Sequence, residues 1–387
     1  MVKIYRLRRA LFVSFLALGF AMATWVVRTP SIRDALDAST LEMGLILFGF
    51  SVGSMGGILT AAKLVAIFGA NRCVTGGLTA AMAGLTVLAA GTEYASLWIA
   101  GMGLGLVGLG MAVGEVSVNI LGAHVEQRLR RTVLTAIHGC FSLGTAIGAV
   151  IGLGVVSFDL SAQWHLIFAS VLLAQLLIYV FVGVRGFRCN EVEDGHESGF
   201  FRTIKKDPKL LLVGLIVLAV ALSEGAANDW LPLLIVDSHG VEERLGLLVF
   251  LAFAVTMTVG RFVGEGLVNR FGPVCVMRVS GFIGAAGILA VIVAPNVYIA
   301  SAAVILWAAG AALGFPVAMS AGAANGPNAS ARISVLATIG YTAFLVGPPL
   351  LGFVGEEVGL RLAMLIVLAL QVFPVLLAAN LSGPKRA

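Results

Sequence analysis

The most constraining feature of this sequence is a run of apolar residues long enough to cross a bilayer. Residues 210–235 read LLLVGLIVLAVALSEGAANDWLPLLI, and about 20 apolar residues in a helix span roughly 30 Å of hydrocarbon. Glu224 lies about 21 Å along such a helix, slightly past its middle. A carboxylate at that depth costs on the order of 3 kcal/mol. Because a Leu would avoid this cost, we expect the protein to require the charge.

Eleven further apolar runs fill most of the remaining chain. Hydrophobic residues make up 59% of the 387 residues and charged residues 12%, which is typical of a polytopic helical membrane protein. Twelve helices of about 20 residues use roughly 240 residues and leave no room for a soluble domain. The predicted spans are residues 10–30, 41–67, 73–91, 95–123, 132–157, 164–184, 210–235, 245–268, 273–294, 297–321, 333–355 and 359–380.

The distribution of basic residues predicts the orientation of these spans. An even number of spans puts both termini on one side of the membrane. The opposite side holds only Arg28, Arg33, Arg244 and Arg361 of the 25 Lys and Arg residues. Since cytoplasmic loops carry the excess of Lys and Arg, both termini are expected in the cytoplasm. The excess of positive charge is a topology signal here, and no nucleic-acid partner is expected.

The N-terminus and the cysteines exclude several other features. The basic start and first apolar run resemble a signal peptide, but no small-residue cleavage site follows, so we expect an uncleaved first helix. Four cysteines fall on the predicted cytoplasmic side, where thiols stay reduced, and their spacing fits neither a disulfide framework nor a metal site. No cofactor is expected, and no glycine-rich phosphate loop for ATP is present.

An internal repeat predicts two halves. The segment FGANRCV at residues 68–74 recurs as FGPVCV at residues 271–276, an offset of 203, and Trp25 and Trp230 lie at nearly the same offset. A repeat of this length predicts two related structural units. We expect six-helix halves at residues 1–184 and 210–387, joined by a charged cytoplasmic linker at residues 185–209.

Two local patterns predict how helices begin and pack. Ser39 with Glu42 fits a capping box that opens the second span. The fourth span carries glycines that are expected to form a close-packed face. These are Gly101, Gly103, Gly105, Gly108, Gly110 and Gly114.

Several motifs resemble the major facilitator superfamily. The segment LVNRFG at residues 267–272 is similar to the loop signature of that family, with Asn269 at the position of its Asp, and the earlier copy has Ala66 there. Further stretches resemble a bacterial inner-membrane subgroup similar to fucose permease-like sugar transporters. They are WVVRTPSIRD at 25–34, EVSVN at 115–119, HGCFSLG at 138–144, EGAANDW at 224–230, GFP at 314–316 and YTAFLVGPP at 341–349.

This resemblance implies a secondary active transporter of the bacterial inner membrane that works by alternating access. Its expected partners are lipid, protons and a small solute such as a sugar, and it is expected to act as a monomer. One alternative is a proton-driven efflux antiporter for amphipathic compounds. A non-transporting receptor or scaffold is the alternative from another class. No enzyme is expected, because the sequence has no nucleophile–base or metal constellation.

Three residues are candidates for proton coupling: Glu224, Glu115 and His138. Glu224 is expected to be a lone carboxylate that gains and loses a proton, and the alternative is a static bond or ion pair between helices. Glu115 and Asn119 share a helical face. His138 is expected at the same depth as Asn119, so the three residues can meet. Their cluster would serve proton coupling or substrate contact, or form a structural hydrogen-bond network.

The remaining candidates concern the substrate and the gates. Arg28 and Asp229 are expected to bridge and close an outer gate, or else to snorkel separately to the surface. Prolines within spans, Pro316, Pro348 and Pro349, are expected to bend helices. The candidate substrate residues are Asn119, Asn228, Trp25, Trp230, Phe315 and Tyr341, although both tryptophans also fit an interfacial belt. Arg261, Glu265, Asn269 and Arg270 are expected to form a gating network of salt bridges in the 8–9 loop.

Overall fold

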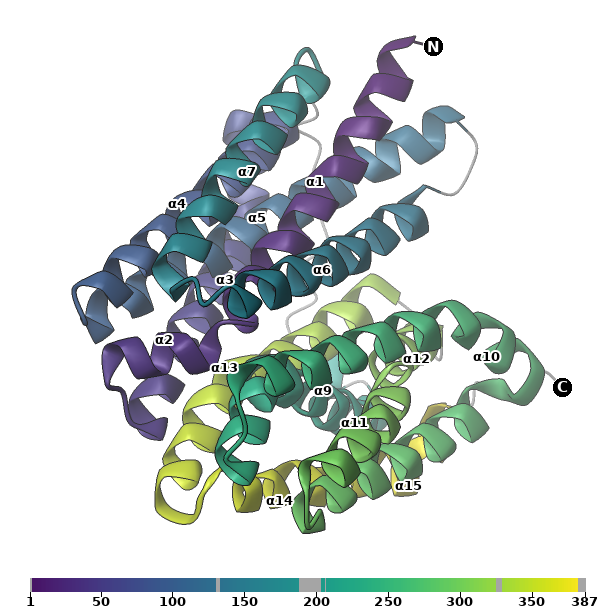
Figure 1. Cartoon of the computed structure of the whole chain (residues 1–387). Coiled ribbons are helices and arrows are strands. Elements are labelled where there is room, and N and C mark those ends of the chain that lie inside the picture. The colour runs from purple at the N-terminus through teal and green to yellow at the C-terminus, as the bar shows by residue number, and fades with distance from the viewer. Residues whose placement is uncertain (1, 130–132, 188–202, 206, 325–328, 382–387) are drawn as a thin grey trace, which may run out of the picture. The chain divides into compact units, whose positions relative to one another are not determined.

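The chain folds as two helical units. The computed structural model describes residues 2–129, 133–187, 203–205, 207–324 and 329–381, and its compact units are Met1–Glu193 and Asp194–Ala387 (Figure 1). Among the described residues all regular elements are helices, and twelve helices are long and apolar enough to cross a membrane. The predicted all-helical membrane fold is therefore confirmed.

The first unit contains six spans and one short helix between the first two spans. Helix α2 lies at the position of the predicted outer loop, and its apolar side chains Ile32 and Leu36 are buried. Its end is marked by Asp37 in a left-handed conformation. The helices of this unit are α1 (Val2–Val26), α2 (Thr29–Leu36), α3 (Thr40–Phe68), α4 (Ala70–Glu93), α5 (Leu97–Leu129), α6 (Leu134–Ser157) and α7 (Ala162–Val184).

The second unit contains six spans, and its helical elements do not coincide one to one with them. Helix α10 holds two spans, and its backbone leaves the helical region at Gly272. Most of the predicted linker, residues 188–202 and 206, lies outside the described part of the chain. The elements of this unit are α9 (Lys209–His239), α10 (Glu243–Val293), α11 (Val297–Ala311), α12 (Gly314–Ala324), α13 (Ala329–Val358), α14 (Leu360–Leu370), α15 (Val372–Leu377) and a 3₁₀ turn, η1 (Ala378–Leu381).

Prolines explain two of the interruptions. Proline has no backbone N–H, and its ring clashes with the carbonyl four residues earlier. Pro316 lies four residues after the break between α11 and α12, and Pro374 lies four residues after the end of α14. The expected bend at Pro316 is therefore present as a break. Pro348 and Pro349 lie inside α13, which continues through them without a break.

The capping box predicted at the start of the second span is present. The hydroxyl of Ser39 accepts a hydrogen bond from the Glu42 backbone N–H at 3.2 Å, and the Glu42 carboxylate accepts one from the Ser39 N–H at 2.9 Å. Two of the N–H groups that a helix start leaves without partners are thereby satisfied. The bonds fix where α3 begins after the α2 connection.

The glycines of α5 pack closely, on two faces. A Cβ built on Gly53 of α3 would lie 1.8 Å from the carbonyl oxygen of Gly105, and one built on Gly110 would lie 2.5 Å from the backbone nitrogen of Ala81 in α4. Side chains at these points would force the helices apart. The expected close-packed face is confirmed, and it extends around α5 so that α3 and α4 both approach its backbone.

Helices α1 and α9 are the most enclosed spans of their units. In the most apolar 18-residue window of each, 72% of the residues are buried, compared with 22% in the window of α6. They open the two repeats. A polar side chain on either helix is therefore held away from lipid and needs an internal partner or a function.

Candidate coupling and substrate site

Glu224 on α9 is paired with Arg261 on α10. One carboxylate oxygen of Glu224 accepts a hydrogen bond from Nη2 of Arg261 at 2.6 Å. The Glu224 side chain is 17% exposed and the Arg261 side chain is 41% exposed. The expectation of a lone carboxylate was therefore wrong. A carboxylate inside a spanning helix is costly when unpaired, and the guanidinium on the neighbouring span offsets that cost.

The neighbouring residue fixes this part of α9 against α11. Ser223 is fully buried, and its hydroxyl oxygen accepts a hydrogen bond from the Trp307 indole N–H at 2.8 Å. The Trp307 ring packs edge-on against Phe253 of α10, with centroids 5.9 Å apart. Two helices therefore hold the backbone next to Glu224.

Three further polar or aromatic residues follow on α9 within two helical turns. Asn228 is half-buried, Asp229 is 7% exposed, and Trp230 is fully buried. The indole N–H of Trp230 has no hydrogen-bond partner among the described residues. A buried donor without a partner costs about 1–3 kcal/mol, so this N–H is a candidate for binding a ligand.

The predicted aromatic residues do not share one environment. Phe315 is half-buried at the start of α12, where a Cβ built on Gly340 would lie 3.2 Å from its ring. Tyr341 on α13 is 36% exposed. Trp25 is fully buried like Trp230, so neither tryptophan belongs to an interfacial belt. Their roles in substrate binding stay predictions.

Arg28, between α1 and α2, is buried inside the first unit. Arg28 is 3% exposed, and its guanidinium donates to the Leu160 carbonyl at 2.7 Å. The alternative that Arg28 snorkels to the surface is therefore wrong. Trp25, one turn earlier, lies against Phe50 of α3 with ring centroids 5.3 Å apart. Because Arg28 and Asp229 belong to different units, the predicted outer gate stays a prediction.

The predicted cluster of Glu115, Asn119 and His138 stays a prediction. His138 is exposed, and its ring lies edge-on to Phe15 of α1 at 4.8 Å. Asn119 Oδ1 is buried without a hydrogen-bond partner in the described part of the chain, and Glu115 is exposed. The predicted bond between Asn119 and His138 also stays a prediction. The packing of α6 on α1 places the His138 ring against Phe15.

This packing of α6 on α1 is set by glycine. A Cβ on Gly144 would lie 2.0 Å from the Leu16 carbonyl oxygen, and one on Gly19 would lie 2.0 Å from that of Phe141. The two backbones touch at both points, so the rotation of α6 is fixed. The position of a residue along its helix can be counted from the sequence. The direction in which its side chain points depends on how that helix is rotated about its axis.

The predicted gating network of the 8–9 loop is described only in part. Arg261 binds Glu224 as described, and the side chain of Glu265 lies outside the described residues. Asn269 is exposed, and the Arg270 guanidinium lies over the Phe271 ring, 5.3 Å from its centroid. Arg261 therefore belongs to the intramembrane pair with Glu224. Whether Asn269 and Arg270 take part in gating stays a prediction.

Two polar features were missed at the sequence level. His165 of α7 is 1% exposed, and neither ring nitrogen has a hydrogen-bond partner in the described residues. Arg332 of α13 is 4% exposed and forms an ion pair with Asp207, just before α9. It also donates to the Gly322 carbonyl at 2.7 Å. The signal for His165 was available, because an ionisable residue within a span is a functional candidate by default.

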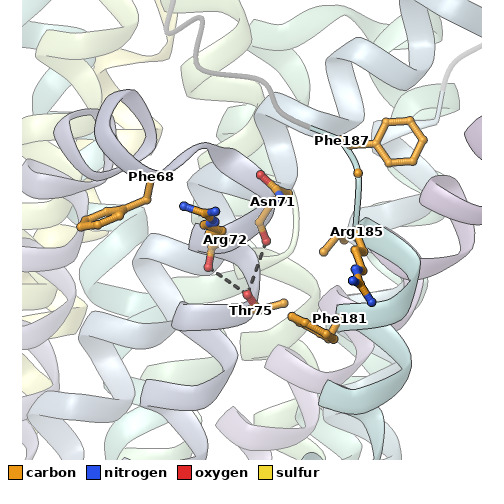
Figure 2. Close-up of a pocket in the computed structure, with 9 residues that line it drawn as sticks. Phe68, Asn71, Arg72, Thr75, Phe181, Arg185 and Phe187 are labelled. Carbon is orange, nitrogen blue, oxygen red and sulfur yellow. Dashed lines mark hydrogen bonds between the residues drawn. The ribbon is translucent and has the colours of Figure 1, made fainter.

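A cavity lies away from all of the predicted site residues. Its volume is about 360 Å³, and the end of α3, the start of α4 and the end of α7 surround it (Figure 2). Phe68, Asn71, Arg72, Phe181, Arg185 and Phe187 lie on its wall. It is therefore a separate site within the first unit.

Twelve apolar helices in two units define a multi-pass membrane protein, and comparison with known proteins identifies its family. The sequence profile of the Major Facilitator Superfamily matches residues 10–332. The chain belongs to this family and is a transporter of a small solute. The expected family resemblance is thereby confirmed.

Similar proteins cover almost the whole chain. A Sinorhizobium fredii protein named as the uncharacterized transporter y4wD is 28% identical over 360 residues, which are 93% of this chain and 94% of that protein. A variant of the E. coli fucose:proton symporter FucP shares the fold with a TM-score of 0.66 at 18% identity, over 97% of this chain and 98% of that one. The nucleoside transporter NupG has a TM-score of 0.74 at 14% identity, over 98% of both chains.

Proposed function

We propose that this protein is a proton-coupled symporter that imports a small polar solute by alternating access. The observation that carries the proposal is the ion pair between Glu224 and Arg261 within the spanning part of the second unit. A proton on Glu224 removes its charge and releases Arg261. Protonation thus changes the relative energies of two conformations, which is what coupling requires.

A sugar-like substrate is favoured by hydrogen-bonding groups that have no partner. The indole N–H of Trp230 and the amide oxygen of Asn119 are buried, and neither has a hydrogen-bond partner among the described residues. A hydroxylated solute offers both donors and acceptors to such groups. The named substrates of two structural neighbours, fucose with a proton and a nucleoside, are compatible with this class.

The first experiment identifies the solute and tests coupling. Thermal-shift screening of the purified protein against sugars, nucleosides, amino acids and lipophilic cations selects a ligand. Proteoliposomes with an imposed pH gradient then measure its accumulation. Glu224→Gln is expected to abolish gradient-driven accumulation and to keep solute exchange, because the glutamine cannot take up a proton. Glu357→Gln, at an exposed carboxylate, is the matched control and is expected to accumulate solute normally.

Two outcomes would overturn the proposal. Undiminished accumulation in Glu224→Gln would remove this carboxylate from coupling. Acidification of the outer medium when solute is added to cells would mean that protons leave as solute enters, and the expected result is alkalinisation. Selective binding of lipophilic cations would instead support the alternative, an efflux antiporter for amphipathic compounds. The receptor or scaffold alternative is not favoured by membership of a transporter family.

The proposed setting is a bacterial inner membrane, with both termini in the cytoplasm and a monomer as the working form. The positive-inside distribution supports this orientation, since only Arg28, Arg33, Arg244 and Arg361 fall on the outer side. Glu115, His138, Asn228, Phe315 and Tyr341 remain proposed contributors. Each lies in a span, and each is exposed or half-buried.

A further inference from the structure

The cavity between α3, α4 and α7 has an electropositive wall. The side chains of Arg72 and Arg185 line it (Figure 2), and neither guanidinium has an ion pair or hydrogen bond to another described residue. None of the described residues that line the cavity is Asp or Glu. A third arginine, Arg6 of α1, donates to the Arg185 carbonyl at 3.2 Å. Guanidinium groups gathered without carboxylates favour an anion, and a phosphate matches their geometry.

The wall also offers a hydrogen-bond acceptor. The Oδ1 atom of Asn71 is buried and has no donor among the described residues. The hydroxyl of Thr75, which also lines the cavity, donates to the backbone carbonyls of Arg72 at 3.0 Å and Asn71 at 3.5 Å and not to Asn71 Oδ1. Burying an acceptor without a donor costs about as much as losing a hydrogen bond. The ligand that fits therefore carries a donor in addition to its negative charge.

The edge of the cavity is apolar. Phe68 at the end of α3 is 47% exposed, and Phe181 in the last turn of α7 is 53% exposed. Figure 2 shows both rings beside the arginines. A free phosphate or sugar phosphate gains nothing from exposed phenyl rings. A molecule with a charged head and hydrocarbon chains contacts all of these groups.

We propose that this cavity binds the headgroup of an anionic phospholipid such as phosphatidylglycerol. The phosphate lies between Arg72 and Arg185, a headgroup hydroxyl donates to Asn71 Oδ1, and the acyl chains cover Phe68 and Phe181. The expected topology puts these helix ends at the cytoplasmic leaflet. A basic cluster at that surface attracts anionic lipid. This site is separate from the Glu224–Arg261 pair, and its occupation does not depend on the proposed symport.

Native mass spectrometry of the detergent-purified full chain tests the proposal. The protein is titrated with palmitoyl-oleoyl phosphatidylglycerol, with phosphatidylcholine of the same chains, and with inorganic phosphate. We expect one tightly bound phosphatidylglycerol and no comparable phosphatidylcholine. Arg72→Gln with Arg185→Gln is expected to weaken its binding on the order of 20-fold, because each basic group near the surface contributes appreciably. Arg9→Gln with Arg278→Gln removes two exposed arginines elsewhere and is expected to bind normally.

A second variant keeps the test decisive if the double arginine variant does not fold. Asn71→Asp puts a carboxylate into the cavity, where it pairs with the arginines and repels phosphate, so we expect it also to lose phosphatidylglycerol. Unchanged phosphatidylglycerol binding in either folded variant overturns the proposal. Phosphatidylcholine that binds as tightly as phosphatidylglycerol would show that the cavity does not select lipids by their negative charge, which also overturns the proposal. Stabilisation by inorganic phosphate equal to that by phosphatidylglycerol shows a site for a soluble anion and overturns the lipid assignment.

Discussion

At the scale of single residues, the pair of Glu224 and Arg261 combines partial burial with partial exposure. Arg261 keeps 41% of its side-chain surface accessible, so it can leave Glu224 for another position at a modest cost. A fully enclosed pair would be static, because separating it would strand two charges in a medium of low dielectric constant. The exposure of Arg261 is therefore as important to the proposed mechanism as the charge of Glu224.

The pair predicts a measurable coupling energy. Arg261→Ala leaves the Glu224 carboxylate without its partner, and Glu224→Gln leaves the guanidinium without its own. The double variant is expected to be more stable than the sum of the single losses predicts, by about 1–3 kcal/mol. Denaturant unfolding in detergent at neutral pH measures this cycle.

The pair Arg33 and Asp34 serves as the comparison for that cycle. It lies on α2 with the Asp34 side chain 68% exposed, and its coupling is expected to stay below about 1 kcal/mol, as for surface pairs. Equal coupling in the two cycles would contradict a special role for the membrane pair.

At the scale of helices, the contact of α3 with α5 is limited by the space that glycine leaves. Gly53→Ala places a methyl group 1.8 Å from the Gly105 carbonyl oxygen, so the helices must separate. We expect a loss of about 1–3 kcal/mol, as for other overpacked contacts. Gly56→Ala, in the same helix, has no atom within 4 Å of the added carbon and is expected to leave stability unchanged or slightly improved.

Thermal unfolding of detergent-solubilised protein measures both alanine variants. A large drop in the melting temperature for both, or for neither, would mean that the α3–α5 contact does not control the stability of this unit.

The positions of the helices were predictable from the sequence. The side-chain contacts between different helices were predictable only in part. The capping box at Ser39 and the glycines of α5 follow from neighbours within one helix, and the structure contains both. The partner of Glu224 is 37 residues away, and spacing along one helix cannot predict a partner at that separation. The contact of the His138 ring with Phe15 of α1 depends on how closely α1 and α6 approach. Patterns along one helix do not contain this rotational information.

At the scale of the whole molecule, the distribution of arginines predicts which ends of the helices face the cytoplasm. Cys275 is exposed near Gly272, on the predicted cytoplasmic side. Tyr94, 75% exposed between α4 and α5, lies on the predicted outer side. In a background whose other cysteines are serine, Cys275 is expected to react with a membrane-impermeant maleimide only in inside-out vesicles.

The complementary protein carries Tyr94→Cys and no other cysteine. It is expected to react only in right-side-out vesicles. The reverse pattern would invert the topology, and it would also place the proposed lipid site in the outer leaflet.

The repeat also restricts which kind of residue can occupy one turn in each half. Gly69 and Gly272, 203 residues apart, have nearly the same backbone angles, with φ of 85° and 78° and ψ of 146° and 160°. This region is essentially restricted to glycine among L-residues. Around Gly272 a Cβ would meet no atom within 4 Å, so only chirality forbids a side chain there. A D-alanine introduced by semisynthesis fits this conformation, and the mirror-image L-alanine does not. The two halves therefore share a stereochemical requirement at this turn. In a natural chain, whose other residues are all L, only the achiral glycine meets it.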